Sequence, residues 1–236
     1  MSWIRLRQIA LVASDLELVV AELGSLLGLR VAHRDPAVAA FGVLNAVLPL
    51  GTQFVEVVSP TRPDTAAGRQ LSRLGGDGGY MVIGHAGPGP VDHRALRDRV
   101  AELGIRVPFE HAYPDGYELL QLHPSDTGGS FLEIDYQPGG DDPHGPWMPA
   151  GVHWPEVAST QVAEAIIGVE IRVPDPLAVA GRWSEITGTP RADTTLTWDN
   201  ATIVFTEGHG GLVAVDCTGA VEATHRIGGV DFRIHT

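Results

Sequence analysis

The stretch LQLHPSDTGGSFLEIDY, residues 120–136, joins a His-Pro turn and a glycine pair to a short apolar strand with one acid, Glu133, in its middle. Successive side chains of a strand point to opposite faces, so Glu133 shares a face with Asp135, while Leu132 and Ile134 point the other way. The apolar face predicts packing against a helix. The acid on the opposite face is a candidate for chemistry.

An earlier segment shows a complete unit that ends in the same kind of strand. Residues 6–12 alternate apolar side chains, and residues 16–27 follow with helical spacing. Ser14 and Asp15 are candidate N-caps of this helix, and Gly28 can adopt the left-handed conformation that ends it. Three short strands are then predicted, around residues 30–34, 39–48 and 53–58. The unit therefore has the order βαβββ.

The same order recurs further along the chain. A strand at 80–86, a helix at 91–103 and strands near 107, 117–122 and 131–136 are predicted for the second unit. GLRV at Gly28 and GIRV at Gly104 mark the same helix exit. A third copy is offset by 160 positions, with these matches: Asp15 with Asp175, Gly28 with Gly188, and GTQFVEVV (51–58) with GLVAVDCT (211–218).

These repeats predict an α+β fold built from βαβββ units. Residues 1–137 form a first domain of two paired units, 1–60 and 76–137, and residues 161–236 form a third, incomplete unit with an extra C-terminal strand. Between them, residues 138–160 are rich in Pro and Gly and are predicted to be a linker or covering loop. Trp147 and Trp154 are expected to pack this loop over the first domain.

Composition limits the classes of function. The 236-residue chain has a formal charge of −13, and its 16 basic residues are all Arg. Such a surface repels nucleic acid and anionic membranes, which leaves a small molecule as the expected partner. The single cysteine, Cys217, excludes a disulfide framework. With no signal-peptide pattern or long apolar run, we expect a cytoplasmic protein, and the Lys-free, Arg-rich composition suggests a bacterial source.

Strand parity selects the candidate site residues. Gln8 lies on the face of its strand opposite Ile9 and Leu11, and Glu56 lies on the corresponding face of the fourth strand of its unit. Tyr80 stands in the second unit at the position expected to match Gln8. Pairing the two units would bring Gln8, Glu56, Tyr80 and Glu133 together near a pseudo-twofold axis.

The repeated units, the polar residue in the first strand, the acid in the fourth strand and the LHPSDTGGSFLEI segment resemble the vicinal oxygen chelate superfamily, notably glyoxalase I and methylmalonyl-CoA epimerase. The resemblance implies a half-open barrel around a divalent metal (Mg, Mn, Zn, Ni or Co). It also implies that Gln8, Glu56 and Glu133 are metal ligands. The family has a histidine where this chain has Tyr80, which is therefore interpreted as a cavity wall or a weak ligand.

The implied activity is a metal-dependent isomerase, epimerase or lyase that acts on a small carbonyl compound through an enolate, with Glu56 or Glu133 as the base. Two alternatives remain: a metal-free binding or resistance protein, and a dioxygenase. The acids could also be solvated groups at a rim, with Gln8 satisfying a backbone group.

Five further positions are considered for the site. His123 is expected to be structural, and His85 and His111 are possible substitute ligands. Gly168 and Asp216 stand at the equivalent positions of the third unit and provide too few ligands for a second metal centre. An odd number of units would leave a sheet edge that the first half, or a second copy in a homodimer, could cover.

Overall fold

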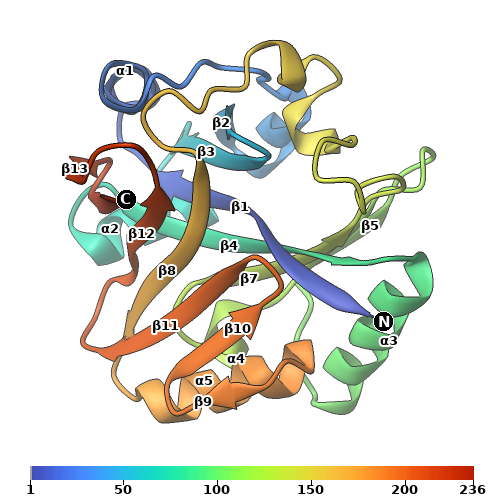
Figure 1. Cartoon of the computed structure of the whole chain (residues 1–236). Coiled ribbons are helices and arrows are strands. Elements are labelled where there is room, and N and C mark those ends of the chain that lie inside the picture. Colours follow the sequence, from blue (N-terminus) through green and yellow to red (C-terminus); the bar gives the residue numbers. More distant parts are fainter. Residues whose placement is uncertain (1) are drawn as a thin grey trace.

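The computed structural model describes residues 2–236 and contains two seven-stranded sheets (Figure 1). The first sheet has the order β2-β3-β1-β4-β7-β6-β5. Its strands are β1 (Trp3–Val12), β2 (Val43–Leu50), β3 (Gln53–Pro60), β4 (Gly78–Gly87), β5 (Phe109–Ala112), β6 (Glu118–Gln121) and β7 (Phe131–Tyr136). Its helical segments are α1 (Leu16–Leu27), the 3-10 helix η1 (Pro36–Phe41), α2 (Ala66–Leu74), α3 (Pro90–Glu102) and α4 (Pro124–Thr127).

The second sheet has the order β13-β14-β12-β8-β11-β10-β9. Its strands are β8 (Ala165–Val173), β9 (Arg191–Ala192), β10 (Thr195–Trp198), β11 (Ala201–Glu207), β12 (Gly211–Thr218), β13 (Ala223–Ile227) and β14 (Val230–His235). Helix α5 (Pro176–Thr187) follows β8, and the short 3-10 helices η2 (Met148–Ala150) and η3 (Trp154–Glu156) precede it. No helix within residues 2–236 is long and apolar enough to cross a membrane.

Strand pairing in the first sheet confirms the predicted fold class. Strand β1 pairs parallel with β3 and antiparallel with β4, and β4 pairs parallel with β7. The two units thus meet along β1 and β4 and curl into a half-open barrel. The helix boundaries follow from local chemistry: Asp15 caps the backbone N–H groups of Glu17 and Leu18, and Gly28 ends α1 with φ 68°. Asp175 and Gly188 do the same for α5.

The C-terminal part differs from the predicted strand match. Strand β11 pairs parallel with β8 and is the fourth strand of the unit that begins with β8. Strand β12 instead pairs antiparallel with β8, as β4 does with β1, and β14 pairs parallel with β12. The match of residues 211–218 with 51–58 is therefore wrong, because β12 occupies the place of a first strand. Strands β12, β13 and β14 repeat the pairing of a unit without its helix.

Two local elements also differ from the sequence prediction. Helix α2 lies in a segment for which no element was predicted, where Thr65 caps it by accepting a hydrogen bond from the backbone of Gly68. The strand expected around residues 30–34 is reduced to a single bridge at His33, and residues 39–41, the start of the strand expected at 39–48, belong to η1 instead. Asp35 caps η1 through the backbone N–H of Ala37.

The two faces of each sheet have different environments. One face of each sheet joins α1, α3 and α5 in a shared apolar core. The opposite face of the first sheet carries a second apolar cluster that includes Phe54, Trp147 and Trp154. Residues 138–160, here named the strap, supply both tryptophans, which are 1% and 2% exposed. The expected packing of this segment over the first domain is confirmed.

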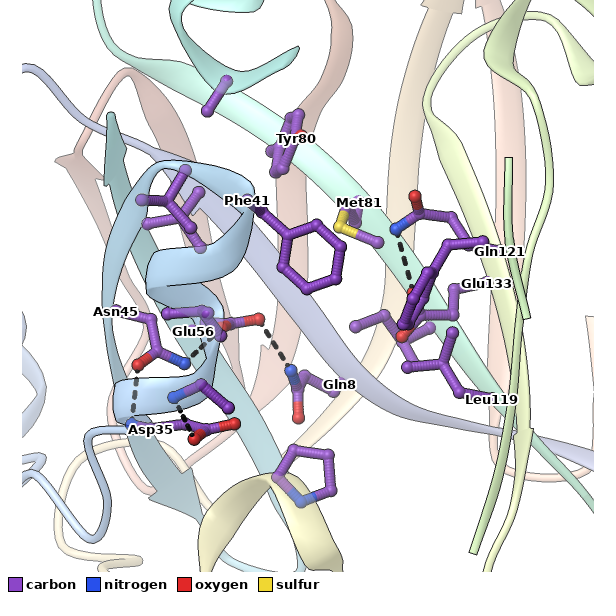
Figure 2. Close-up of a pocket in the computed structure, with 18 of the residues that line it drawn as sticks. Gln8, Asp35, Phe41, Asn45, Glu56, Tyr80, Met81, Leu119, Gln121 and Glu133 are labelled. Carbon is purple, nitrogen blue, oxygen red and sulfur yellow. Dashed lines mark hydrogen bonds between the residues drawn. The ribbon is translucent and has the colours of Figure 1, made fainter. Parts of the chain in front are cut away.

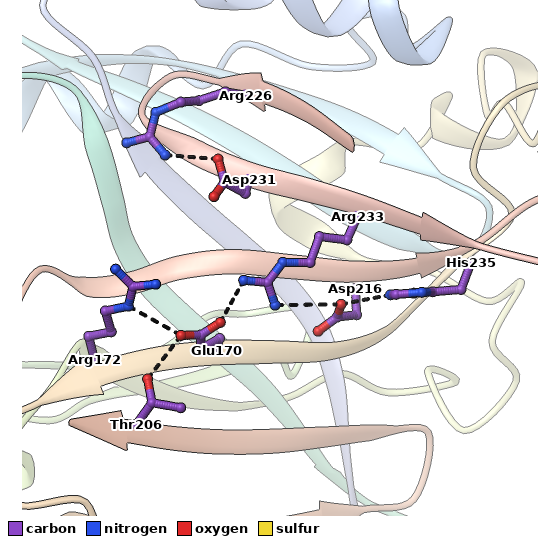
Figure 3. Close-up of polar contacts among 8 residues, drawn as sticks. All are labelled: Glu170, Arg172, Thr206, Asp216, Arg226, Asp231, Arg233 and His235. Carbon is purple, nitrogen blue, oxygen red and sulfur yellow. Dashed lines mark hydrogen bonds and ion pairs between the residues drawn. The ribbon is translucent and has the colours of Figure 1, made fainter. Parts of the chain in front are cut away.

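The opposite face of the second sheet is covered by ion pairs instead (Figure 3). Glu170 contacts Arg172 and Arg233, at 3.2 Å and 2.6 Å. Asp216 pairs with Arg233 at 3.9 Å and with His235 at 2.8 Å. Each acid on this face therefore has a cationic or titratable partner from the same chain.

Candidate active site

A cavity of about 200 Å³ lies on the strap-covered face of the first sheet (Figure 2). All seven strands of the first sheet contribute to its lining, together with η1, α2 and the strap. Its polar lining residues are Gln8, Asp35, Asn45, Glu56, Tyr80, Tyr113, Tyr117, Gln121 and Glu133. The other lining side chains are apolar, among them Phe41, Met81, Ile83 and Phe109.

All four residues selected from strand parity line this cavity. Figure 2 shows Glu56 and Glu133 on opposite sides, with Gln8 between them. Glu56 comes from β3 and Glu133 from β7, the strands that flank the central pair β1 and β4. Tyr80 lies on the wall formed by β4.

Tyr80, however, is not the equivalent of Gln8. Gln8 pairs with Phe54, two residues before Glu56, and Met81 pairs with Phe131, two residues before Glu133. Met81 is therefore the pseudosymmetric match of Gln8.

Tyr80 reaches the cavity because the register between β1 and β4 shifts there. Ala10 pairs with Met81 and Leu11 with Gly79, which leaves Tyr80 as the extra residue of a β-bulge.

Glu56 is held by two neutral amides. Asn45 donates to Oε1 at 2.8 Å and Gln8 donates to Oε2 at 2.9 Å. Burial raises the pKa of Glu56, the two amide hydrogen bonds act in the opposite direction, and the nearby charge of Asp35 raises it further. The two donors hold the carboxyl in one orientation.

The amide of Gln8 has a defined orientation as well. Its Oε1 accepts a hydrogen bond from the indole Nε1 of Trp147 at 2.8 Å. An indole N–H can only donate, so the oxygen of Gln8 must face Trp147 and its nitrogen must face Glu56. Gln8 is 1% exposed, and turning the amide over would place two donors against each other in a buried site.

Glu133 lies in a less polar setting. It is 6% exposed, and its Oε2 accepts from the amide of Gln121 at 3.1 Å. Burial raises its pKa to about 7, the charge of Glu56 adds to this, and the hydrogen bonds with Gln121 and Asp135 oppose it. Glu133 therefore exchanges its proton near neutral pH.

Asp135, two residues further along β7, is fully buried beside Glu133. Its Oδ2 accepts a hydrogen bond from the hydroxyl of Tyr117, while its Oδ1 has no partner among the described hydrogen bonds. Burial and the charge of Glu133 raise the pKa of Asp135 well above its usual value. Two carboxyls this close cannot both ionise without a large cost, so the pair holds a proton near neutral pH.

The residues present do not fit a divalent metal of the kind that the resemblance implies. The oxygen of Gln8, its ligating atom, is directed at Trp147. The position equivalent to Gln8 in the second unit is Met81, whose thioether is a poor partner for the hard cations that carboxylates bind. Only Glu56 and Glu133 remain, one on each side of the cavity. Within residues 2–236, no group of three or more His, Cys, Asp or Glu side chains is arranged to hold a metal ion.

The histidines lie elsewhere. His85 is 1% exposed beneath the strap, where its Nε2 accepts from the backbone N–H of Gln137 at 3.3 Å. Burial, with the charge of Arg7, lowers the pKa of His85 to about 3. His111 is exposed on β5. His123 has the structural role expected of it, since its Nδ1 accepts the backbone N–H of Ser125 at the start of α4.

Sequence analysis missed the residues that hold the site in shape. Gln121 pairs directly with Glu133 across β6 and β7, a relation that follows from strand register once the partner is known. Arg7 is the extra residue of the other bulge between β1 and β4, which lies in β1, and it anchors the strap. Its Nη1 donates to the carbonyls of Thr52 at 2.5 Å and Pro143 at 2.8 Å, and burial lowers its pKa to about 10.

Three solved structures are similar to this chain or to part of it. A hypothetical protein from Staphylococcus aureus covers 98% of this chain and 99% of its own, with a TM-score of 0.69 at 13% identity. Methylmalonyl-CoA epimerase from Streptomyces coelicolor, in complex with 2-nitronate-propionyl-CoA, covers 57% of this chain and 98% of its own, with a TM-score of 0.48 at 24% identity. The epimerase from Mycobacterium tuberculosis covers 56% and 86%, with a TM-score of 0.46 at 18% identity.

A search of curated protein sequences finds no match. The profile of the glyoxalase-like domain family matches residues 9–187, which is more than half of the chain. This span runs from the first strand of the first sheet to the end of α5 in the second half. The chain therefore belongs to the glyoxalase-like domain family of the vicinal oxygen chelate superfamily.

Proposed function

We propose that the cavity binds a small carbonyl compound, and that Glu133 moves a proton to and from the carbon next to the carbonyl group without a divalent metal. The observation that carries this proposal is a buried carboxyl in the cavity wall whose pKa is raised to about 7. A base with a pKa near the working pH combines a useful ionised fraction with a useful driving force for proton transfer.

The rest of the cavity supports the same chemistry. Glu56 faces Glu133 across the cavity, so a proton removed on one side could be returned on the other, as an isomerase or epimerase requires. Tyr80 and Tyr113 also line it, and burial raises the pKa of both hydroxyls. Both therefore stay protonated at neutral pH and can donate to an oxyanion that develops on the substrate. A lyase outcome would need a leaving group on the neighbouring carbon.

The test is deuterium exchange. A panel of small ketones and aldehydes is incubated with the protein in D₂O, and proton NMR follows loss of the signal next to the carbonyl. We expect exchange that is faster with protein than without it, and that is unchanged by EDTA. Panel members that bind without any exchange would contradict the proposal.

A metal titration tests the donor set directly. We expect Mg²⁺, Mn²⁺, Zn²⁺, Ni²⁺ and Co²⁺ to leave the melting temperature unchanged, because a cation that binds only the native state would raise it with concentration. The control is the double variant Glu56→Gln/Glu133→Gln. A rise in melting temperature that is seen in the wild type and absent from this variant would support a metal site formed by Glu56 and Glu133. A shift present in both would come from another part of the surface.

A metal-free binding protein is the second candidate, because most of the cavity lining is apolar or aromatic. Saturable binding without exchange would favour it. The dioxygenase alternative has less support, since none of the lining residues is the histidine that such a site needs.

A further inference from the structure

Within residues 2–236, the acids of the cavity have no cationic partner. Three carboxyl side chains, Asp35, Glu56 and Glu133, line it, and no Arg or His side chain of the described chain does. Their hydrogen-bond donors are neutral: two amides for Glu56, one amide for Glu133 and a backbone N–H for Asp35. Glu133 is 6% exposed, and within residues 2–236 its hydrogen-bond partners are the amide of Gln121 and the carboxyl of Asp135, with no cation among them.

The second sheet provides an internal comparison. Its strap-free face carries Glu170 on β8 and Asp216 on β12, and the chain supplies Arg172, Arg233 and His235 as their partners (Figure 3). Glu133 is buried, whereas Glu170 and Asp216 are half-buried, and yet no cation within residues 2–236 pairs with Glu133. Because an unpaired buried charge is costly, the missing positive charge is a property that a ligand could supply.

Cationic groups near the cavity are already committed elsewhere. Arg7 lies under the strap, where it donates to main-chain carbonyls and stacks within 5.5 Å of the Trp147 ring. Arg69 on α2 influences Tyr80, but it donates to the carbonyl of Asp64 and is not part of the lining.

Five aromatic rings share the rest of the lining with aliphatic side chains. Rings from Phe41, Tyr80, Phe109, Tyr113 and Tyr117 line the cavity. Phe41 and Phe109 meet edge to face with centroids 4.9 Å apart, and Tyr113 and Tyr117 lie 5.6 Å apart. Aromatic rings beside carboxylates are the surroundings that proteins use to bind ammonium groups, because the ring face attracts a cation.

Size limits the ligand further. A cavity of about 150 Å³ holds a benzene molecule, so about 200 Å³ accommodates a single ring with a short substituent. We infer that the cavity takes a small organic amine, protonated at neutral pH, whose ammonium group lies between Glu56 and Glu133 and whose apolar part contacts the aromatic walls. The inference rests on the proposed function in taking this cavity as the substrate site, and it narrows the substrate class to carbonyl compounds that also carry an amine.

The experiment compares three probes of one shape and different charge: benzylamine, benzyl alcohol and benzoate. Binding to the full chain at pH 7.5 is measured by titration calorimetry. We expect benzylamine to bind at least about tenfold more tightly than benzyl alcohol, which corresponds to about 1.4 kcal/mol, and benzoate to bind most weakly. Equal affinities, a preference for benzoate, or no measurable binding of benzylamine would overturn the inference.

Two variants locate the effect. Glu56→Gln keeps the shape of the side chain and removes one charge. It should therefore weaken the binding of benzylamine and leave the binding of benzyl alcohol unchanged. Glu222→Gln, at an exposed position, changes the net charge equally and should affect neither probe. A similar loss of benzylamine binding in both variants would assign the preference to the overall charge of the protein and would overturn the inference.

The outcomes separate this inference from the proposed function. Selective binding of benzylamine without proton exchange in any amine-bearing ketone would support the ligand class and contradict the proton transfer. Exchange in neutral ketones without a preference for benzylamine would support the proton transfer and contradict the ligand class.

Discussion

Replacing Glu133 by Gln is expected to slow proton exchange by about a hundredfold to ten-thousandfold. Gln has nearly the same shape and can still accept the hydrogen bond from Gln121, but it cannot take up a proton. In the wild type, the exchange rate should rise with pH through about 7, because the ionised form of Glu133 is the base. The measurement is the pH dependence of deuterium exchange, followed by proton NMR. Glu133→Gln should show no such rise.

The pH dependence of the free energy of unfolding distinguishes loss of the base from a folding defect as the cause of slower exchange in Glu133→Gln. The pKa of Glu133 is raised from 4.5 to about 7 in the folded protein, so the native state binds this proton more tightly than the unfolded state does. The free energy of unfolding of the wild type should therefore fall as pH rises between these values, and Glu133→Gln should fall less. The control Glu222→Gln should have the same exchange rate as the wild type and the same pH dependence of the free energy of unfolding. Full exchange activity in Glu133→Gln would exclude Glu133 as the base.

Replacing Trp147 by Ala is expected to lower the free energy of unfolding by about 3–5 kcal/mol. The indole is 1% exposed, stacks near Phe54 and contacts the guanidinium of Arg7, so its removal opens a large hole beneath the strap. Trp147→Phe keeps most of the packing but leaves the oxygen of Gln8 without its donor, at a cost of about 1–3 kcal/mol. Chemical denaturation measures both.

Ligand affinity distinguishes the role of Trp147 from general packing. Trp147→Phe releases the amide of Gln8, and with it one of the two donors to Glu56, so binding of benzylamine should change together with stability. Trp183→Phe is the matched control, because that indole is equally buried and donates to the carbonyl of Thr127 in the core shared by the two halves. It should lower stability and leave affinity unchanged. Equal effects of the two Phe variants on affinity would contradict the positioning of Glu56 through Trp147 and Gln8.

The regular parts of the site could be predicted because strand parity depends only on neighbouring residues. No register shift interrupts the pairing of β1 with β3 from Gln8 onward or the pairing of β4 with β7 around Glu133, and Gln8, Glu56 and Glu133 all face the cavity. The prediction failed for Tyr80, where a bulge inserts one residue and transfers the equivalence with Gln8 to Met81. A bulge leaves no reliable mark in the local pattern, because it depends on the register of the partner strand.

The C-terminal half shows a related limit. Residues 51–58 and 211–218 have similar patterns, each a short apolar strand with one acid. One pairs parallel with the first strand of its sheet and the other antiparallel. Alternation of side chains is the same in both cases, so the local pattern does not contain the direction of the neighbouring strand.

The sequence by itself determined the βαβββ units, a helix that begins at Ser14 or Asp15 and ends at Gly28, and the face of the sheet on which the acids lie, because each of these depends on residues close together in the chain. Tertiary structure alone decided the chemistry of those acids. Trp147, 139 positions from Gln8, orients the amide that holds Glu56, and burial by distant segments raises the pKa of Glu133. Desolvation and hydrogen-bond direction depend on what surrounds a group in space, and local sequence does not specify them.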